Sequence, residues 1–214
     1  MPVENNPLNL ITFFAILSLL PIIFVMTSSF IKISMVLLLT RESLGVQQVP
    51  PNMVIYCLSL ILSFYIMSPV YNSTINSITD QEPQNAHEFI VKLQSSSQDT
   101  KKFLIKHTAK SQVDFFYQSI QELWPANMRA KVKRDDIVIL VPAFMVTEIT
   151  AAFKIGFLIY LPSIIIDIIV SNILMAMGMM MMSPQTISLP IKLLLFIILD
   201  GWSRLIHVLF NTYS

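Results

Sequence analysis

Residues 137–182 form a run of 46 positions that is almost entirely apolar. Helices are the expected way for such a run to lie in lipid, because a helix satisfies its own backbone hydrogen bonds. A single helix of that length would extend roughly 69 Å, more than twice the hydrocarbon core of a bilayer. We therefore expect a break at Pro162, and we expect Asp135 and Asp136 to cap the first helix.

Three more apolar stretches cover residues 8–39, 53–71 and 187–210, which makes five stretches if the longest run divides. The first is predicted to be one long span, kinked near Pro21. The chain is 54% hydrophobic and 13% charged, whereas a soluble domain carries about 25% charged residues. The sequence predicts an all-α integral membrane protein. No basic residue precedes the first stretch, so a cleaved signal peptide is not expected.

A polar insert divides the chain into three expected parts: an N-terminal helix pair (1–71), the insert (72–136) and the C-terminal apolar helices (137–214). Within the insert, helical spacing places Phe116, Ile120 and Leu123 on one face, and residues 86–93 show a weaker pattern. The insert is expected to pack against a partner or against copies of itself.

Basic residues give a weak indication of topology. Lys32, Arg41 and Lys192 flank the loops that we place inside the cell. The insert and both termini then lie outside.

Six ionisable residues lie in the apolar half of the chain: Glu148, Lys154, Asp167, Lys192, Asp200 and Arg204. An unpaired charge at the bilayer centre costs about 2.5–3.5 kcal/mol, so pairing is the simplest explanation. Asp200 and Arg204 are four positions apart, so we expect them to pair on one face of a helix. Glu148 is expected to pair with Lys192, within or between subunits. We interpret these charges as assembly clamps. A proton or ion relay through Glu148 and Asp167, or residues that simply line water, are the alternatives.

Other classes of function find little support in the sequence. The net charge of +1 argues against nucleic acid, and one cysteine excludes an intrachain disulfide. No phosphate-binding glycine loop, metalloprotease motif or serine–histidine arrangement suggests an enzyme, and no cofactor is expected. An ion- or proton-coupled small-molecule transporter remains the alternative, although such proteins usually have repeats and more spans.

Six methionines occupy eight positions between Met175 and Met182. Copper binding by thioethers would usually require nearby His or Cys, and simple helix packing suits only the first part of the run. We favour a third interpretation, in which several chains place Met179, Met180 and Met182 around a pore. Because methionine is flexible, such a ring would seal against ions yet yield to a polypeptide. The flanking Ser-Pro and Ser-Leu-Pro sequences are expected to bracket a loop over residues 183–190.

Several segments of the second half resemble one family closely. They are LVPAFMVTE at 140–148, AFKIGF at 152–157, LMAMGMMMMSP at 174–184, ISLPIK at 187–192 and DGW at 200–202, together with Pro162 and Asp167. The chain is similar here to the core export-apparatus family of bacterial type III secretion, called FliP in flagella and SctR in injectisomes. The short N-terminus favours the injectisome branch.

The resemblance implies about four membrane helices and a pentameric ring in the bacterial inner membrane, extending toward the periplasm. It implies assembly with SctS-like and SctT-like subunits, contact with SctU-like and SctV-like components, and passage of unfolded secreted polypeptides. The family's methionine gasket falls on Met179, Met180 and Met182, and its intersubunit salt bridge on Glu148 and Lys192. Asp167 matches the family's acidic position in the third span.

Overall fold

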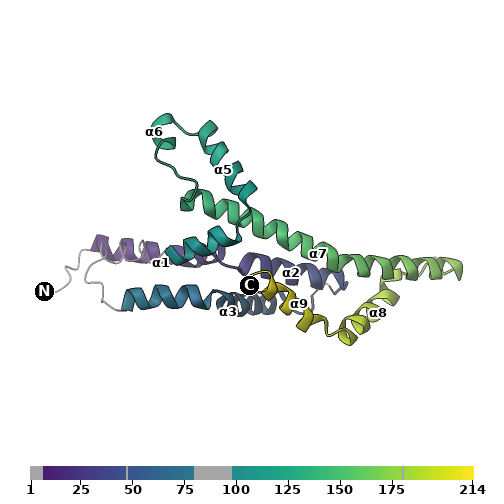
Figure 1. Cartoon of the computed structure of the whole chain (residues 1–214). Helices are drawn as coiled ribbons and strands as arrows, with labels where there is room; N and C mark the ends of the chain where they lie inside the picture. The colour runs from purple at the N-terminus through teal and green to yellow at the C-terminus, as the bar shows by residue number, and fades with distance from the viewer. Residues whose placement is uncertain (1–6, 47, 80–97, 180) are drawn as a thin grey trace. The chain divides into compact units, whose positions relative to one another are not determined.

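The computed structural model describes residues 7–46, 48–79, 98–179 and 181–214, and within these residues there are helices but no strand. The helices are α1 (Pro7–Thr27), α2 (Phe30–Ser43), α3 (Asn52–Thr79), α5 (Lys110–Leu123), α6 (Ala126–Arg129), α7 (Ile137–Ala176), α8 (Pro184–Ile198) and α9 (Gly201–Asn211) (Figure 1). Residues 98–107 are also helical. The prediction of an all-α protein is confirmed.

Two compact units divide the chain. The first combines Met1–Ile31 with Phe64–Glu148, and the second combines Lys32–Ser63 with Ile149–Ser214. These units differ from the three parts predicted from polarity, because segments that pack together need not share a composition. The insert, for example, groups with the first three turns of α7.

Between two and four membrane spans fit the lengths and composition of the helices. Residues Asn52–Asn72 and Ile137–Ala176 are each long and apolar enough, and two bent helix pairs could each supply one more. The expected break at Pro162 is wrong, since α7 is a continuous helix of 40 residues. An apolar helix tolerates proline where neighbouring groups satisfy the backbone that it leaves unpaired.

The first apolar stretch breaks at Ser28 and Ser29, and Pro21 lies inside α1. Both serines are buried, and the Ser28 hydroxyl accepts a hydrogen bond from the Phe30 N–H at 3.3 Å. A serine oxygen that accepts a backbone N–H at the start of a helix stabilises that start. The kink predicted near Pro21 therefore lies at Ser28 and Ser29, and the stretch still counts as one candidate span made of two helices.

The loop expected over residues 183–190 is largely helix, because α8 begins at Pro184 and continues through Pro190. A proline at the first position of a helix costs little, since the N–H that it lacks would have no partner there. The loop therefore ends at Ser183.

A small apolar core holds the insert against the start of α7. Leu104, Leu140 and Phe144 are buried, and Phe103, Val113 and Val141 pack against them. Helix α5 confirms the predicted amphipathic segment, and its Ile120 is buried. Leu123, by contrast, is 80% exposed, because it is the last residue of the helix and Pro125 follows. The predicted pattern over 86–93 lies outside the described residues.

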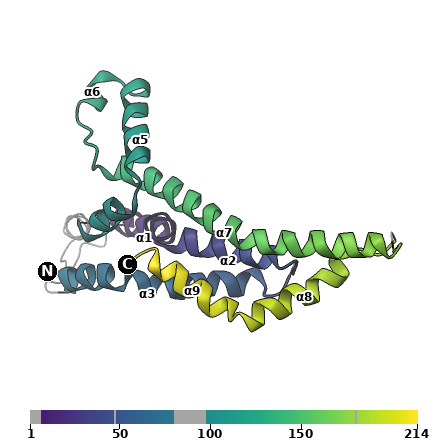
Figure 2. The ribbon, with the colours of Figure 1, turned by 45° about the vertical axis from the view of Figure 1, so that its right-hand side comes forward.

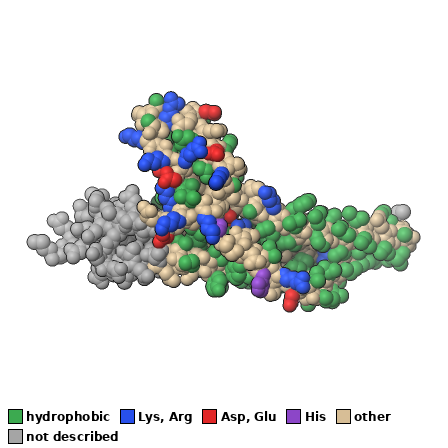
Figure 3. All heavy atoms as spheres, viewed as in Figure 1, with side chains coloured by type: hydrophobic (Ala, Val, Ile, Leu, Met, Phe, Trp, Pro, Cys, Tyr) green, Lys and Arg blue, Asp and Glu red, His purple; other side chains and the backbone are tan. Residues whose placement is uncertain are grey.

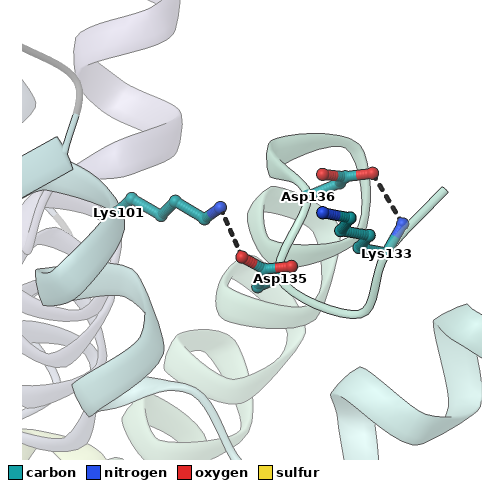
Figure 4. A network of polar contacts seen from close by, with 4 residues as sticks. All are labelled: Lys101, Lys133, Asp135 and Asp136. Carbon is teal, nitrogen blue, oxygen red and sulfur yellow. Dashed lines mark hydrogen bonds and ion pairs between the residues drawn. The ribbon is translucent and has the colours of Figure 1, made fainter. Parts of the chain in front are cut away.

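Charged side chains cover the outside of the insert. Lys101 pairs with Asp135 at 2.6 Å, and the Lys133 backbone N–H donates to the Asp136 carboxylate at 2.7 Å (Figure 4). The hydrogen bond from Lys101, and then a backbone hydrogen bond, lower the pKa of Asp135. α7 begins at the next residue after Asp136, and the Leu140 N–H donates to the Asp136 carbonyl. The two carboxylates bind Lys101 and the Lys133 N–H instead of the first N–H groups of α7, so among the described residues the predicted side-chain cap does not form.

Candidate functional site

The methionine loop, residues 177–183, joins α7 to α8. Figure 2 shows α8 turning back from the C-terminal end of α7. The end of α7 is closed by two backbone hydrogen bonds: the Met179 N–H donates to the Leu174 carbonyl and the Gly178 N–H to the Met175 carbonyl. Gly178 has a φ of 74°, a left-handed conformation that favours glycine. This is a Schellman motif, so local chemistry ends the helix at the methionines.

The methionine side chains of the loop are exposed in the single chain. Met179 is 37%, Met182 44% and Met181 fully exposed. Met180 lies outside the described residues. Apolar side chains held at a turn in this way are suited to contact another chain rather than a core of their own.

The α7–α8 clamp, formed by Asp167, Ser188 and Lys192, joins the two helices behind the loop. Lys192 Nζ lies 2.6 Å from Asp167 Oδ2, with the lysine side chain 7% and the aspartate side chain 39% exposed. Ser188 is buried and lines the same cavity as Asp167 and Lys192. Ser188 and Lys192 are one helical turn apart, so they lie on the same face of α8.

A cavity of about 870 Å³ opens beside this clamp, inside the second unit. Asp167, Ser188 and Lys192 line it, together with Arg41 and Glu42 from the end of α2. Arg41 donates hydrogen bonds to the Pro50 carbonyl and to the Asn52 side chain, at 3.0 and 2.6 Å. Asp167 Oδ1 is buried and has no hydrogen-bond partner among the described residues. The cavity is therefore polar on the side that faces the clamp.

Of the six charges predicted to pair, the single chain brings Asp167 and Lys192 together. The expected pair of Glu148 with Lys192 stays a prediction for contacts between subunits; Glu148 is 2% exposed. Lys154 is exposed.

The pair expected between Asp200 and Arg204 does not occur among the ion pairs of the described residues. Asp200 precedes α9 as its N-cap, in the left-handed conformation, instead of lying inside the helix. The i,i+4 geometry of a continuous helix therefore does not apply to its side chain. Only the backbone joins the two residues, through the Arg204 N–H and the Asp200 carbonyl.

Two features of the second unit were not predicted from the sequence. Lys32 is buried, and its Nζ lies 3.8 Å from the centre of the Tyr213 ring, a cation–π contact. Gly156 on α7 approaches α2 so closely that a Cβ there would overlap the Leu39 side chain. Gly156 was part of the segments that resemble the family. Hydropathy, however, does not predict which residue a glycine, or a residue near the end of the chain, will contact.

Comparison with protein families gives a match to the FliP family model over residues 13–209. That match covers all of the second unit except the last five residues, and it includes the methionine loop and the α7–α8 clamp.

The similarity to known proteins extends over nearly the whole chain. The chain is 47% identical to Yop proteins translocation protein R of Yersinia pestis, over 98% of this chain and 97% of the relative. It is 43% identical to the hypersensitivity response secretion protein HrcR of Ralstonia nicotianae, over 96% of each. It is 41% identical to the virulence protein YscR of Salmonella typhimurium, over the full length of both.

Proposed function

This chain belongs to the FliP family and is a membrane subunit of a secretion apparatus, and we propose that it forms the pore of a type III export gate. Unfolded substrate proteins would cross the bacterial inner membrane through that pore. The chain acts as a structural component that conducts polypeptides, and the proposal assigns it no catalytic step.

The observation that carries this proposal is the methionine loop. Its side chains are flexible, apolar and exposed, while its backbone is held by the Schellman turn on one side and by Pro184 on the other. A seal around varied polypeptides requires this combination of soft side chains and a defined backbone. Met179, Met180 and Met182 of several copies would close the pore.

The pore requires several copies, and exposed apolar surface supports such an assembly. Large side chains on one long stretch of α7 are exposed in the single chain, among them Phe153, Phe157 and Leu158. We propose a ring of five copies, assembled with SctS-like and SctT-like subunits and in contact with SctU-like and SctV-like components. The insert would lie on the periplasmic side.

Contact between copies would use Glu148 and Lys192. A buried acid such as Glu148 is stable when a cation faces it. Lys192 has three donors, so it can donate to Asp167 within its own chain and still donate to Glu148 of a neighbour. Glu148→Gln removes the contact between copies, keeps the Asp167–Lys192 pair, and should weaken assembly.

The gasket proposal is tested with Met179→Ala and Met182→Ala together, in cells that express the complete apparatus. Smaller side chains should leave the closed pore open to ions and small solutes, so the leak rises. Met128→Ala is the matched control, because this exposed methionine lies on α6, outside the loop. An unchanged leak at equal amounts of assembled complex would refute the gasket.

A coupled transporter would behave differently. It would move a small solute in liposomes that contain this chain alone, driven by an ion gradient. We expect no such transport without the neighbouring subunits.

A further inference from the structure

We propose that the α7–α8 clamp sets the position of the methionine loop, with Asp167 as the positioning residue. The inference deepens the proposed function and rests on it in so far as the loop is the seal. The clamp itself, however, is a property of the single chain, and it is measurable without any assumption about what the loop does.

The clamp sits at matching distances from the loop along both helices. Asp167 lies nine residues before Ala176, where α7 ends, and Lys192 lies eight residues after Pro184, where α8 begins. These arms are about 14 and 12 Å long. Because the helix segments between the ion pair and the loop are nearly equal in length, the ion pair fixes how far the end of each helix extends toward the loop.

Apolar surfaces alone would fix that position poorly. α7 and α8 present isoleucine, leucine and methionine side chains over long stretches, and such side chains exchange neighbours at little cost. A buried charged group, in contrast, has one well-satisfied arrangement, and buried polar groups specify register best where they have few alternative partners. Within the described residues, Asp167 forms its ion pair with Lys192 of α8, and Ser188 is buried on the same face of that helix.

The chemistry of the three groups makes Asp167 the centre of the clamp. Lys192 and Ser188 are each buried, and the Lys192 ammonium pairs with the Asp167 carboxylate. The loss of the Asp167 charge would therefore leave the Lys192 ammonium buried without its counter-ion. The ammonium would then move toward the cavity or toward another chain, and α8 would carry the loop with it.

The test uses a spin label at the tip of the loop in the complete chain, expressed with its neighbouring subunits. Cys57→Ser removes the one native thiol, and Met181→Cys places the label on a fully exposed side chain. Met128→Cys provides a matched label on the insert. The mobility of each label is compared between the parent chain and Asp167→Asn, at equal amounts of purified complex.

We expect Asp167→Asn to shorten the rotational correlation time at position 181 by about twofold, as for a segment released from local order, and to leave position 128 unchanged. Ser188→Ala, which keeps the ion pair, should give a smaller change, and Asp167→Glu should restore most of the order. If Asp167→Asn does not assemble, Ser188→Ala carries the comparison.

Ion leak through the same complexes separates the two proposals. Greater mobility at 181 with an unchanged leak would support the clamp and contradict the gasket. Unchanged mobility at 181 in both variants, or an equal change at 128, would overturn the clamp whatever the leak.

Discussion

The insert and the α7–α8 region distribute polar and apolar side chains in opposite ways. Where the insert packs on the start of α7, Leu104 and Phe144 are buried, and lysines, arginines and aspartates of the insert lie outside. In the α7–α8 region, Ser188 and Lys192 are buried, and isoleucines and methionines are exposed. Figure 3 shows the contrast: blue side chains gather over α5 and α6, and green ones cover the far end of α7.

This difference indicates which surroundings each region is built for. A region with an apolar core and a charged surface is stable in water on its own. A region with exposed apolar helices and a buried polar clamp is complete only when lipid or other subunits cover it. The described part of the insert thus has a surface suited to water, while the α7–α8 region has a surface suited to lipid or to other subunits.

The largest expected effect is in the apolar core between the insert and the start of α7. Phe144→Ala removes a fully buried ring and should lower the free energy of unfolding by about 3–5 kcal/mol. Thermal unfolding of the detergent-solubilised chain measures this loss. Phe115→Ala is the control, because Phe115 is largely exposed, and an equal loss there would contradict the contrast between the two regions.

A similar loss should follow when the buried cation of the second unit is removed. Lys192→Met leaves Asp167 without its partner and should cost about 3 kcal/mol, the low end for a buried pair because Asp167 is 39% exposed. Lys154→Met, at an exposed lysine, should change the same unfolding curve little. Equal losses in the two variants would show that burial of the clamp does not contribute to the free energy of unfolding.

Gly156→Ala tests the close approach of α2 to α7. The added methyl group would overlap the Leu39 side chain, and overpacking of this kind costs about 1–3 kcal/mol. Leu39→Ala should rescue part of that loss in the double variant, since it clears the space. Simple addition of the two single losses would argue against the contact.

The smallest effect concerns the exposed ion pair of the insert. Because the folded-state pKa of Asp135 is lowered, its contribution to stability is present above the ordinary value of 3.8 and is lost as the pH falls through the lower folded value. Lys101→Met should reduce this part of the acid dependence, because the Lys101 hydrogen bond is the main cause of the lowered pKa, and should change stability little at neutral pH. A large loss at neutral pH would mean that this surface pair matters more than such pairs usually do.

Local sequence chemistry was sufficient to predict several features. Apolar runs predicted helices, and the helical spacing of Phe116 and Ile120 predicted α5. The methionine loop was predicted to be irregular because Pro184 follows it, and Gly178 completes the turn. Each of these depends on interactions within a few residues.

Other features depended on the tertiary structure. Pro162 and Pro190 both lie inside helices, although a proline in a helix interior usually kinks or ends the helix. The partner of Lys192 was expected to be Glu148, whereas the single chain pairs it with Asp167, which lies 25 positions away. No periodicity relates two residues on different helices, so that pairing required the fold.

The central claim is that the methionine loop lines the path of secreted proteins, and site-specific photocrosslinking tests it most directly. A photoreactive side chain at Met182, in cells whose apparatus holds a stalled substrate, should form an adduct with that substrate. The same side chain at Met128 should form none. Absence of an adduct at Met182 while the stalled substrate crosslinks to other positions of this chain would contradict the account.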